Sequence, residues 1–463
     1  MPSPESRLRA ERVSTAAAAT AQAPIATHAD LTVAANRDPI RLLLAQETTR
    51  IPELVPVRHG RMLASPFAFF RGAALPMAAD LAQLPSSGLW VQLCGDAHLA
   101  NFGAFASPER RLMFDINDFD ETLPGPFEWD LKRFAASLAI AGRANGFSTK
   151  DRRRVMVNVL GRYRSSMQKF AAMPLLDVWY AHLDLEDLIV KFRSQHQHKS
   201  AKQVEATVAK ARTRDQLQVS NKMTHVVNGV PQIVANPPLV VPIEDLTDLD
   251  ADAVAAFLRT QERRYRRSLE GDRRFLLDRF RLVHAARKVV GVGSVGTRDW
   301  ILLFVADDES VLFLQYKEAQ PSGLSGYLGG SAFDNQGERV VQGQRLIQAV
   351  SDIFLGWQRV DAPQSRTQDY YVRQLRDGKV SQSIEALSAS GMIQYGRLCA
   401  WTLARAHART GDRVALTEYM GSSDHFENAL AEFGEAYADQ NERDFAALAD
   451  AVASGQVEAV RGL

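Results

Sequence analysis

The stretch Cys94–Gly103, "CGDAHLANFG", gathers an aspartate, a histidine and an asparagine directly after the apolar run "LWVQL". Asp96 and Asn101 lie five residues apart, and Asp118 and Asp120 follow in "NDFDETLPGP". Carboxylate and amide oxygens at the ends of neighbouring strands are hard ligands, which suit Mg²⁺ and the phosphates that Mg²⁺ binds. Asp and Asn are also common turn formers, so the local sequence alone leaves both interpretations open.

A second candidate is the glycine-rich stretch "GVGSVG", residues Gly291–Gly296. The G-x-G-x-x-G pattern occurs in dinucleotide-binding folds, where a helix follows directly, but here "TRDWILLFV" predicts a strand. A further predicted strand, "SVLFLQYKEA", contains Lys317. A glycine turn followed by a lysine-bearing strand is how protein kinases hold nucleotide phosphates. An ordinary hairpin with a surface lysine is the alternative.

The helix predicted within "GERVVQGQRLIQAVSDIFLGW" contains Glu338, a candidate partner of Lys317. In protein kinases a glutamate on a helix pairs with the phosphate-binding lysine. Gln342, Gln344 and Arg345 are rivals for this role, and a surface position for Glu338 is the simpler alternative.

These motifs resemble those of the aminoglycoside and choline phosphotransferase branch of the kinase-like superfamily. The catalytic loop of that branch has the pattern H-G-D-x-H-x-x-N, which Asp96, His98 and Asn101 match in position, with Cys94 in place of the first histidine. That histidine mainly organises the loop. The metal segment of the branch is similar to "DFDETLPGPFEWDL", where the matching residues are Asp118, Gly125, Pro126, Trp129, Asp130 and Leu131.

Nearly everything after residue 35 also resembles an uncharacterised bacterial family, domain of unknown function 2252 (DUF2252). The stretches that carry this resemblance are "FAFFRGAA", "CGDAHLANFG", "NDFDETLPGPFEWDLKR", "KVVGVGSVGTRDW", "KEAQPS", "RVVQGQR", "YYVRQLRD" and "LARAHARTGD". This second resemblance implies no particular reaction.

The order of the motifs departs from that of an ordinary kinase. The catalytic loop and Asp118 come first, and the glycine loop follows about 170 residues later. The cyclic order is kept, since "DYYVRQLRD" is a candidate hinge strand and "GMIQYGRLCAWTLARAHART" a candidate for the helix that precedes a catalytic loop. Circular permutation is tolerated where termini lie close. The resemblance therefore implies an α+β, protein-kinase-like two-lobe fold that is circularly permuted, with the helical lobe first and the small β-rich nucleotide lobe after it.

The resemblance implies a phosphotransferase that uses ATP and Mg²⁺ and acts on a hydroxyl acceptor, with a small molecule favoured over a protein. Asp96 would orient the attacking hydroxyl, His98 would support the loop, and Asn101 and Asp118 would hold Mg²⁺. The implied nucleotide-binding residues are Gly291, Gly293, Ser294, Gly296, Lys317, Glu338, Gln374 and Leu375, the last two through their backbone at the adenine edge. Phosphoryl transfer needs positioning and charge neutralisation more than covalent catalysis.

Three other functions remain open. They are a non-catalytic nucleotide sensor on the same fold, transfer of AMP instead of phosphate, and a metal-dependent hydrolase built on Asp96, His98, Asp118 and Asp120. The complete set of site residues argues against a sensor, and a hydrolase leaves the glycine loop without a role. Arg71, in "FAFFRGAA", is interpreted as a core residue with one buried pairing, and a place near a phosphate is the alternative.

Composition limits the class of protein. The chain has 463 residues, of which 46% are hydrophobic, so we expect an ordered core. Its net charge is +1, which argues against a general nucleic-acid binder. Two cysteines cannot form a disulfide framework. No apolar run approaches the roughly 18 residues of a membrane span. We therefore expect a soluble cytoplasmic protein that binds a nucleotide and an acceptor, but neither nucleic acid nor membranes.

The predicted elements divide the chain into four parts. Residues 1–35 are expected to form a flexible arm, 36–280 a mainly helical lobe, 281–380 the β-rich lobe, and 381–463 helices that return to the helical lobe. "KMTHVVNGVPQIVANPPLVVPI" predicts a hairpin at its Asn-Gly pair, and residues 250–286 predict a helix. This division places Asp96 and Asp118 in one lobe and Lys317 in the other.

Overall fold

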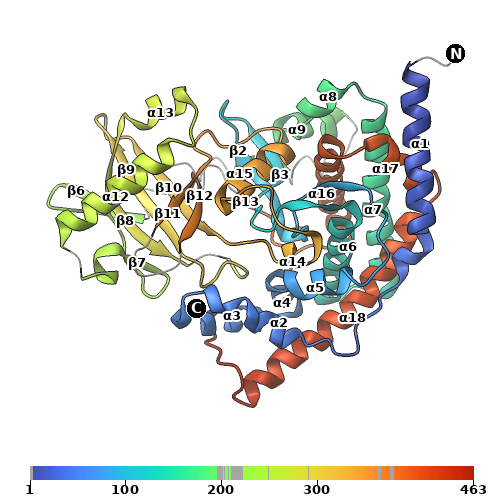
Figure 1. Cartoon of the computed structure of the whole chain (residues 1–463), viewed down its shortest axis with the longest axis horizontal. Coiled ribbons are helices and arrows are strands. Elements are labelled where there is room, and N and C mark those ends of the chain that lie inside the picture. The colour runs from blue at the N-terminus through green and yellow to red at the C-terminus, as the bar shows by residue number, and fades with distance from the viewer. Residues whose placement is uncertain are drawn as a thin grey trace.

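The computed structural model describes residues 4–194, 202, 204–206, 208–209, 223–248, 250–289, 291–361, 367–375 and 380–462. Within these ranges the chain is a mixed α and β protein whose sheets are antiparallel. Figure 1 shows most of the long helices gathered at one end of the molecule and the largest sheet at the other. No helix in these ranges combines the length and the apolar character that crossing a membrane requires.

The helical part is built around four long helices, which are α6 (Phe127–Ala144), α7 (Thr149–Ala171), α16 (Ala389–Thr410) and α18 (His425–Ala453). α16 packs against α7 and α18 packs against α6, although long stretches of sequence separate the partners. α6 is buried over nearly its whole length, because small residues such as Ala135 and Ala139 let the neighbouring helices approach closely. The other helices around this core are α1 (Pro4–Gln22), α8 (Leu175–Tyr180), α9 (Leu185–Ser194) and α17 (Arg413–Met420).

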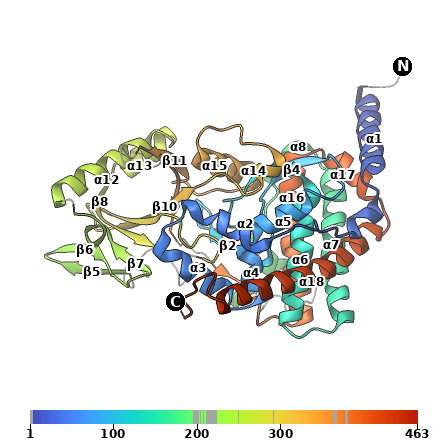
Figure 2. The same cartoon turned by 60° about the horizontal axis from the view of Figure 1, so that its bottom comes forward.

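Short N-terminal helices lie between the helical part and the largest sheet (Figure 1 and Figure 2). They are α2 (Pro39–Ala45), α3 (Val55–Met62), α4 (Pro66–Gly72) and α5 (Ala74–Leu81), with 3-10 turns η1 (Ile25–Ala29), η2 (Glu47–Thr49) and η3 (Pro52–Leu54). Prolines stand in the first turn of α2, α3 and α4. Proline suits that position, since the first N–H groups of a helix have no partner within it.

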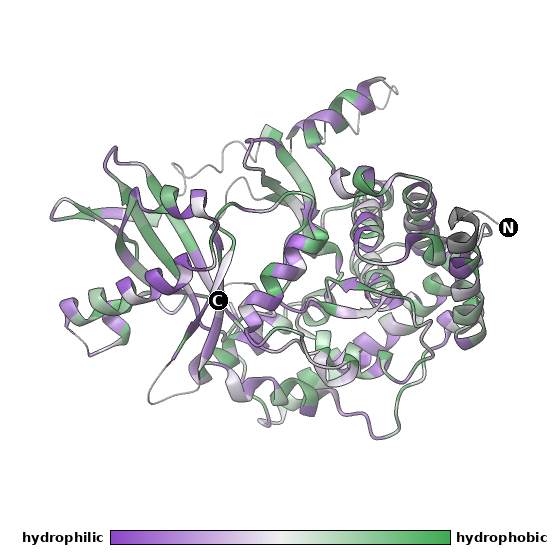
Figure 3. Ribbon diagram, turned by 45° about the horizontal axis from the view of Figure 1, so that its top comes forward, coloured by the Kyte–Doolittle hydropathy of each residue, from purple (hydrophilic) through white to green (hydrophobic). Residues whose placement is uncertain are grey.

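The β-rich part is a six-stranded sheet in the order β11-β12-β10-β9-β8-β7. Its strands are β7 (Val240–Pro242), β8 (Phe280–Lys288), β9 (Asp299–Ala306), β10 (Val311–Ala319), β11 (Gly356–Val360) and β12 (Gln368–Gln374). α12 (Ala251–Arg266) and α13 (Gly271–Leu277) share a hydrophobic cluster with the sheet, through Tyr265 and Leu277. Figure 3 shows hydrophobic colouring along much of these strands. α14 (Ser325–Leu328) and α15 (Gln336–Ile347) follow β10, and α15 contacts β11 and β12.

Smaller sheets frame the polar segments. β1 (Trp90–Leu93) pairs with β4 (Leu123–Pro126), and β2 (Phe102–Ala106) lies between β3 (Leu112–Ile116) and β13 (Val380–Ser381). A short 3-10 turn, η4 (Leu99–Asn101), leads into β2. The loops after β1 and after β3 are therefore brought to the same region of the molecule.

The hairpin predicted at Asn-Gly is confirmed as β5 (Thr224–Val227) and β6 (Val230–Ile233). Asn228 and Gly229 have φ values of 50° and 79°, as the tight turn of a two-residue hairpin requires.

Three expectations differ from the structure. The helix predicted over residues 250–286 is wrong in its last part, because Phe280–Lys288 is strand β8 and pairs with β9. Sheet pairing has overridden the helical preference of a stretch rich in Arg and Ala. The predicted arm before residue 35 contains helix α1, whose Ala16 and Ala19 are buried, and α1 packs against α17. The sheet also includes β7 and the helices α12 and α13 contact it, although all three precede residue 281.

Candidate functional site

The segment after β1 is fixed by contacts with α6. Asp130, in the first turn of α6, accepts hydrogen bonds from the N–H groups of Cys94 (2.9 Å) and Gly95 (3.0 Å). Gly95 has a φ of 80°, and a Cβ at this position would lie 2.2 Å from the carbonyl oxygen of Glu121. Only glycine fits here. The stretch from Cys94 to Asn101, called the aspartate loop below, is therefore held firmly where it leaves the strand.

The carboxylate of Asp96 contacts two side chains. Its Oδ1 accepts a hydrogen bond from Nε of Arg133 at 2.5 Å, and its Oδ2 lies 3.5 Å from Nε2 of His98. Burial raises the pKa of Asp96, and the Arg133 guanidinium opposes that shift. Burial and the nearby Arg71 and Arg133 lower the pKa of His98 well below its usual value. The imidazole is therefore neutral near pH 7.

Asn101 joins the aspartate loop to the loop that follows β3. Its Nδ2 donates to the carbonyl oxygens of Asp96 (3.0 Å) and Asp118 (3.1 Å), and its own carbonyl accepts from the N–H of Asn117 (2.9 Å). Oδ1 of Asn101 is buried and accepts no hydrogen bond from the part of the chain that the structure describes.

These oxygens suit Mg²⁺. Oδ1 of Asn101 and the carboxylate of Asp118 are hard ligands from two adjacent loops, and Mg²⁺ that keeps waters and phosphate oxygens needs only one or two protein ligands. The described residues contain no group of three or more His, Cys, Asp and Glu side chains placed to hold a metal by themselves. The donor set therefore fits an ion that arrives with a phosphate ligand.

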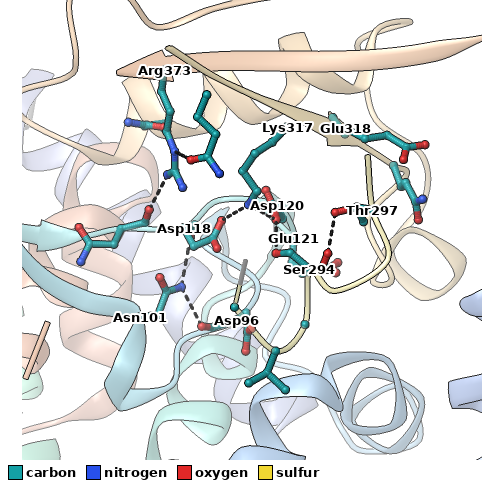
Figure 4. Close-up of a pocket in the computed structure, with 18 of the residues that line it drawn as sticks. Asp96, Asn101, Asp118, Asp120, Glu121, Ser294, Thr297, Lys317, Glu318 and Arg373 are labelled. Atoms are coloured by element: carbon teal, nitrogen blue, oxygen red, sulfur yellow. Dashed lines mark hydrogen bonds and ion pairs between the residues drawn. The ribbon is translucent and has the colours of Figure 1, made fainter. Parts of the chain in front are cut away.

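Lys317, on β10, pairs with the loop after β3. Its Nζ lies 2.7 Å from Oδ2 of Asp120 and 3.6 Å from Oδ1 of Asp118 (Figure 4). The hydroxyl of Tyr371 donates to Oδ1 of Asp120 at 2.7 Å. Burial lowers the pKa of Lys317, but the carboxylates of Asp118 and Asp120 outweigh burial and hold it well above its usual value. The ammonium is therefore a fixed positive charge between the sheet and the aspartates.

The predicted pairing of Lys317 with Glu338 is not formed, because the carboxylates within ion-pair distance of its Nζ are those of Asp118 and Asp120. Glu338 stands in the first turn of α15, where Asn335 caps its N–H group, and it does not line the cavity described below.

α15 supports the site through Arg339 instead. The Arg339 guanidinium donates to the carbonyl oxygens of Thr122 (2.7 Å), Asp120 (2.8 Å) and Gln320 (2.8 Å). α15 therefore supports the site by holding the backbone of the loop after β3, and not by pairing a side chain with Lys317.

The glycine loop, Gly291–Thr297, connects β8 with β9 and is held by the N-terminal segment. Arg61 donates to the carbonyl of Gly291 (2.6 Å), Arg50 to that of Val295 (2.5 Å), and the N–H of Ile51 to that of Gly296 (2.8 Å). Glycine suits both ends of the turn, since Gly291 and Gly296 have φ values of 66° and 90°.

The glycine loop also approaches the carboxylates, because Oγ of Ser294 lies 3.5 Å from Oδ2 of Asp120.

The backbone N–H groups of the predicted hinge residues, Gln374 and Leu375, already donate hydrogen bonds within the protein. The N–H of Gln374 donates to the Asp352 carboxylate, and the N–H of Leu375 donates to the carbonyl of Phe313 at 3.0 Å. Both residues line the cavity. Contact with an adenine edge through these N–H groups would therefore require them to exchange partners.

One cavity, with a volume of about 790 Å³, collects most of the predicted residues. The predicted residues that line it are Asp96, His98, Asn101, Asp118, Gly291, Gly293, Ser294, Lys317, Gln374 and Leu375. Glu338 and Gly296 are outside this set. The volume lies in the range of small-molecule sites. Residues from the first and last quarters of the chain thus share one cavity with the glycine loop.

Sequence reasoning gave no role to two side chains that hold the site together, Arg133 and Arg339, and it named Asp120 only as a candidate metal-binding carboxylate. Arg133 contacts Asp96, Arg339 holds the backbone of the loop after β3, and Asp120 pairs with Lys317. Arg133 stands two residues after the Trp-Asp-Leu motif in "WDLKR", which is the one local signal for it. Asp299, paired across the sheet with Lys317, was also missed; burial raises its pKa to about 8.

The model of one protein family matches residues 50–451, a span that contains every site residue named above. Its description is "Uncharacterized protein conserved in bacteria (DUF2252)". The chain belongs to this family. Neither the curated proteins nor the solved structures that were searched include a match to the chain. The function is therefore argued from the site itself.

Proposed function

We propose that this protein is an ATP- and Mg²⁺-dependent phosphotransferase with a circularly permuted kinase-like fold, acting on a hydroxyl group of a small molecule. The observation that carries the proposal is the contact of Lys317 with Asp118 and Asp120 at 3.6 and 2.7 Å. These contacts support the proposal because they bring Lys317, the candidate phosphate-binding lysine, beside a candidate Mg²⁺ site in the cavity that residues of the glycine loop also line.

The arrangement of the sheet supports a nucleotide-binding lobe. β8, β9 and β10 are neighbours in sequence order, with the glycine loop between the first two and Lys317 on the third. β12 lies on the other side of β10, and α15 stands between β10 and β11 in the chain. Protein kinases place their glycine-rich loop, lysine and regulatory helix in this sequence.

The permuted order is supported by the end of α16. The N–H of Gln92, on β1, donates to Oγ1 of Thr410 at 3.1 Å. A Cβ on Gly411 would lie 2.6 Å from the Val91 side chain. The last turn of α16 therefore lies against the strand that enters the aspartate loop, where the unpermuted chain would be continuous.

The chemistry follows from these positions. ATP would lie with its phosphates against the glycine loop and Lys317, and Mg²⁺ at Asn101 and Asp118 would neutralise phosphate charge. Asp96 would accept the proton of the acceptor hydroxyl as the hydroxyl oxygen bonds to the γ-phosphorus. The bond from that phosphorus to the bridging oxygen breaks, and ADP leaves. Burial raises the pKa of Asp96, which brings it closer to that of a working base.

A metal-dependent hydrolase is less well supported by the same geometry. Asp118 and Asp120 already face the Lys317 ammonium. A hydrolase built on these carboxylates would have to hold its metal beside that fixed positive charge, which Coulomb repulsion opposes. In the phosphotransferase, the negative phosphates that lie between Lys317 and Mg²⁺ would offset this repulsion.

Two labels on ATP test the proposal. The protein is incubated with Mg²⁺, an extract of small metabolites and ATP labelled in either its γ- or its α-phosphate. Label transfer from the γ-position alone is expected, and transfer from the α-position alone would show an AMP-transferase. Asp96→Asn should abolish transfer, whereas Asp177→Asn, an exposed aspartate on α8, is the matched control. Absence of transfer from both positions, with ATP binding intact, would favour the sensor.

A further inference from the structure

Three arginines outside the proposed nucleotide lobe line the same cavity. Arg50 follows η2, Arg58 lies on α3, and Arg71 lies on α4. In Figure 4 pale blue helices, the colour of the N-terminal part, lie below Asp96, whereas the strand near Arg373 crosses the top. Of the three, Arg71 acts electrostatically on Asp96, the residue that would meet the acceptor hydroxyl, whereas Arg50 contacts the glycine loop through the carbonyl of Val295.

Arg71 has no partner of its own. Its guanidinium makes no hydrogen bond or ion pair within the described ranges, and its Nε is buried. It is close enough to act electrostatically on both Asp96 and His98. The sequence interpretation of Arg71 as a residue with one buried pairing is therefore not matched by a pairing in the structure.

Arg58 is fully buried, with 0% of its surface exposed. Its Nη2 donates to Oε1 of Gln46 (3.2 Å) and the carbonyl of Gly72 (3.0 Å), but Nε and Nη1 find no hydrogen-bond partner in the described part of the chain. Its nearest carboxylate, Glu47, lies 3.7 Å from Nη1 and makes a closer contact with His59, at 2.5 Å. Arg58 is therefore a buried cation with incomplete compensation.

Arg50 and Glu121 also line the cavity. Nη1 of Arg50 donates to the carbonyl of Val295, and its buried Nε has no hydrogen-bond partner among the residues that the structure describes. Glu121, which also lines the cavity, accepts hydrogen bonds from Ser322 (2.8 Å) and the N–H of Gly323 (2.7 Å). Glu121 is therefore occupied by neutral donors, and buried guanidinium nitrogens of Arg50 and Arg58 are left without a hydrogen-bond partner among the described residues.

We propose that Arg71, supported by the charges of Arg58 and Arg50 in the same cavity, binds an anionic group of the acceptor, a phosphate or a carboxylate. Removing a guanidinium from water without a counter-ion is costly, and oxyanions satisfy guanidinium donors in pairs. Burial lowers the pKa of Arg58 to about 9, so a bound anion would favour its charged form. The inference rests on the proposed function, since Asp96 fixes where the hydroxyl lies; the acceptor is then an anionic hydroxy compound.

Inorganic phosphate and malonate are the probes, measured by thermal shift and calorimetry at constant ionic strength. Phosphate is expected to stabilise the protein, and malonate shows whether a carboxylate serves equally. Arg71→Gln should weaken binding of the effective anion by about tenfold or more, because it removes a charge-assisted contact. Arg71→Lys should restore part of it. Arg71 makes no contact that holds the fold, so Arg71→Gln should fold normally; the exposed Arg41→Gln is the matched control.

The variant Lys317→Met distinguishes this anion site from the proposed nucleotide site. If phosphate binding is lost in Lys317→Met but kept in Arg71→Gln, the anion occupies the proposed nucleotide-phosphate region and the acceptor-anion proposal is overturned. Unchanged anion binding in Arg71→Gln overturns it in any case. A third outcome is that anion binding depends on Arg71 but ATP with Mg²⁺ does not stabilise the protein. This result would support the anion site and contradict the phosphotransferase.

Discussion

Nζ of Lys317 lies 2.7 Å from Oδ2 of Asp120, although the two residues are 197 positions apart. The pair joins the central strand β10 of the sheet to the loop after β3, and Arg339 holds the backbone of the same loop from α15. The proposed phosphate-binding lysine and the candidate Mg²⁺ ligands are therefore connected by direct contacts. A substitution at one of these residues should therefore change the positions of the others.

Lys317→Met should abolish the stabilisation that ATP with Mg²⁺ gives to the wild type. A ligand that binds only the folded state raises the melting temperature by mass action, so the loss reports directly on affinity. The free protein should also lose about 1–3 kcal/mol of unfolding free energy, because the carboxylates of Asp118 and Asp120 are left without their ammonium. Lys317→Arg, which keeps the charge, should lose less stability than Lys317→Met. Thermal shift with and without nucleotide measures both effects, and an unchanged ATP response in Lys317→Met would reject the phosphate-binding role.

Asp96→Asn should separate chemistry from binding. Turnover should fall by at least about 100-fold, as expected for the loss of a general base. The affinity for ATP should stay within a few-fold of wild type, because in the proposed mechanism Asp96 contacts the acceptor and not the nucleotide. Some stability should be lost as well, since Arg133 would keep only a neutral partner at a position where its own side chain is 3% exposed. Single-turnover kinetics with calorimetric ATP binding distinguish the two effects, and wild-type turnover in this variant would contradict the role of Asp96.

The two loops and the lysine could be predicted from sequence because each is a local motif. Their partners could not, because the pairing of Lys317 with Asp120 depends on how β10 docks onto a distant loop. The chemistry of a kinase lysine suggests a helix glutamate, and Glu338 was the nearest candidate in sequence. In the structure, the neighbouring Arg339 instead donates a hydrogen bond to the backbone carbonyl of Asp120. The sequence left the position of Arg71 open between the core and a phosphate site, because only tertiary packing brings α4 to the cavity.

Asn101→Ala should damage both nucleotide affinity and turnover. The substitution removes the two hydrogen bonds to the carbonyls of Asp96 and Asp118, and with them the candidate Mg²⁺ ligand Oδ1. Loss of two buried hydrogen bonds predicts about 1–3 kcal/mol less unfolding free energy. Asn101→Asp keeps an oxygen ligand, so it should retain more Mg²⁺-dependent ATP binding than Asn101→Ala at equal stability. Titration of Mg²⁺ at fixed ATP measures this difference. Equal Mg²⁺ dependence in the two variants and the wild type would show that Asn101 has only a structural role.

Asp299 should make the stability of the protein depend on pH. Burial raises its pKa to about 8, with Lys317 opposing the shift, whereas the unfolded chain should show a value near 4. The folded state therefore binds the extra proton between these values, and its stability falls as pH rises through that window. Asp299→Asn lacks the titrating group, so its unfolding free energy should gain about 2–3 kcal/mol relative to wild type between about pH 5.5 and pH 8. Urea unfolding across this range measures the gain, and Asp307→Asn, at an exposed position after β9, is the control that should follow the wild-type profile. A profile of Asp299→Asn parallel to that of the wild type would mean that the carboxyl is already ionised in the folded protein, held so by Lys317 across the strand pair.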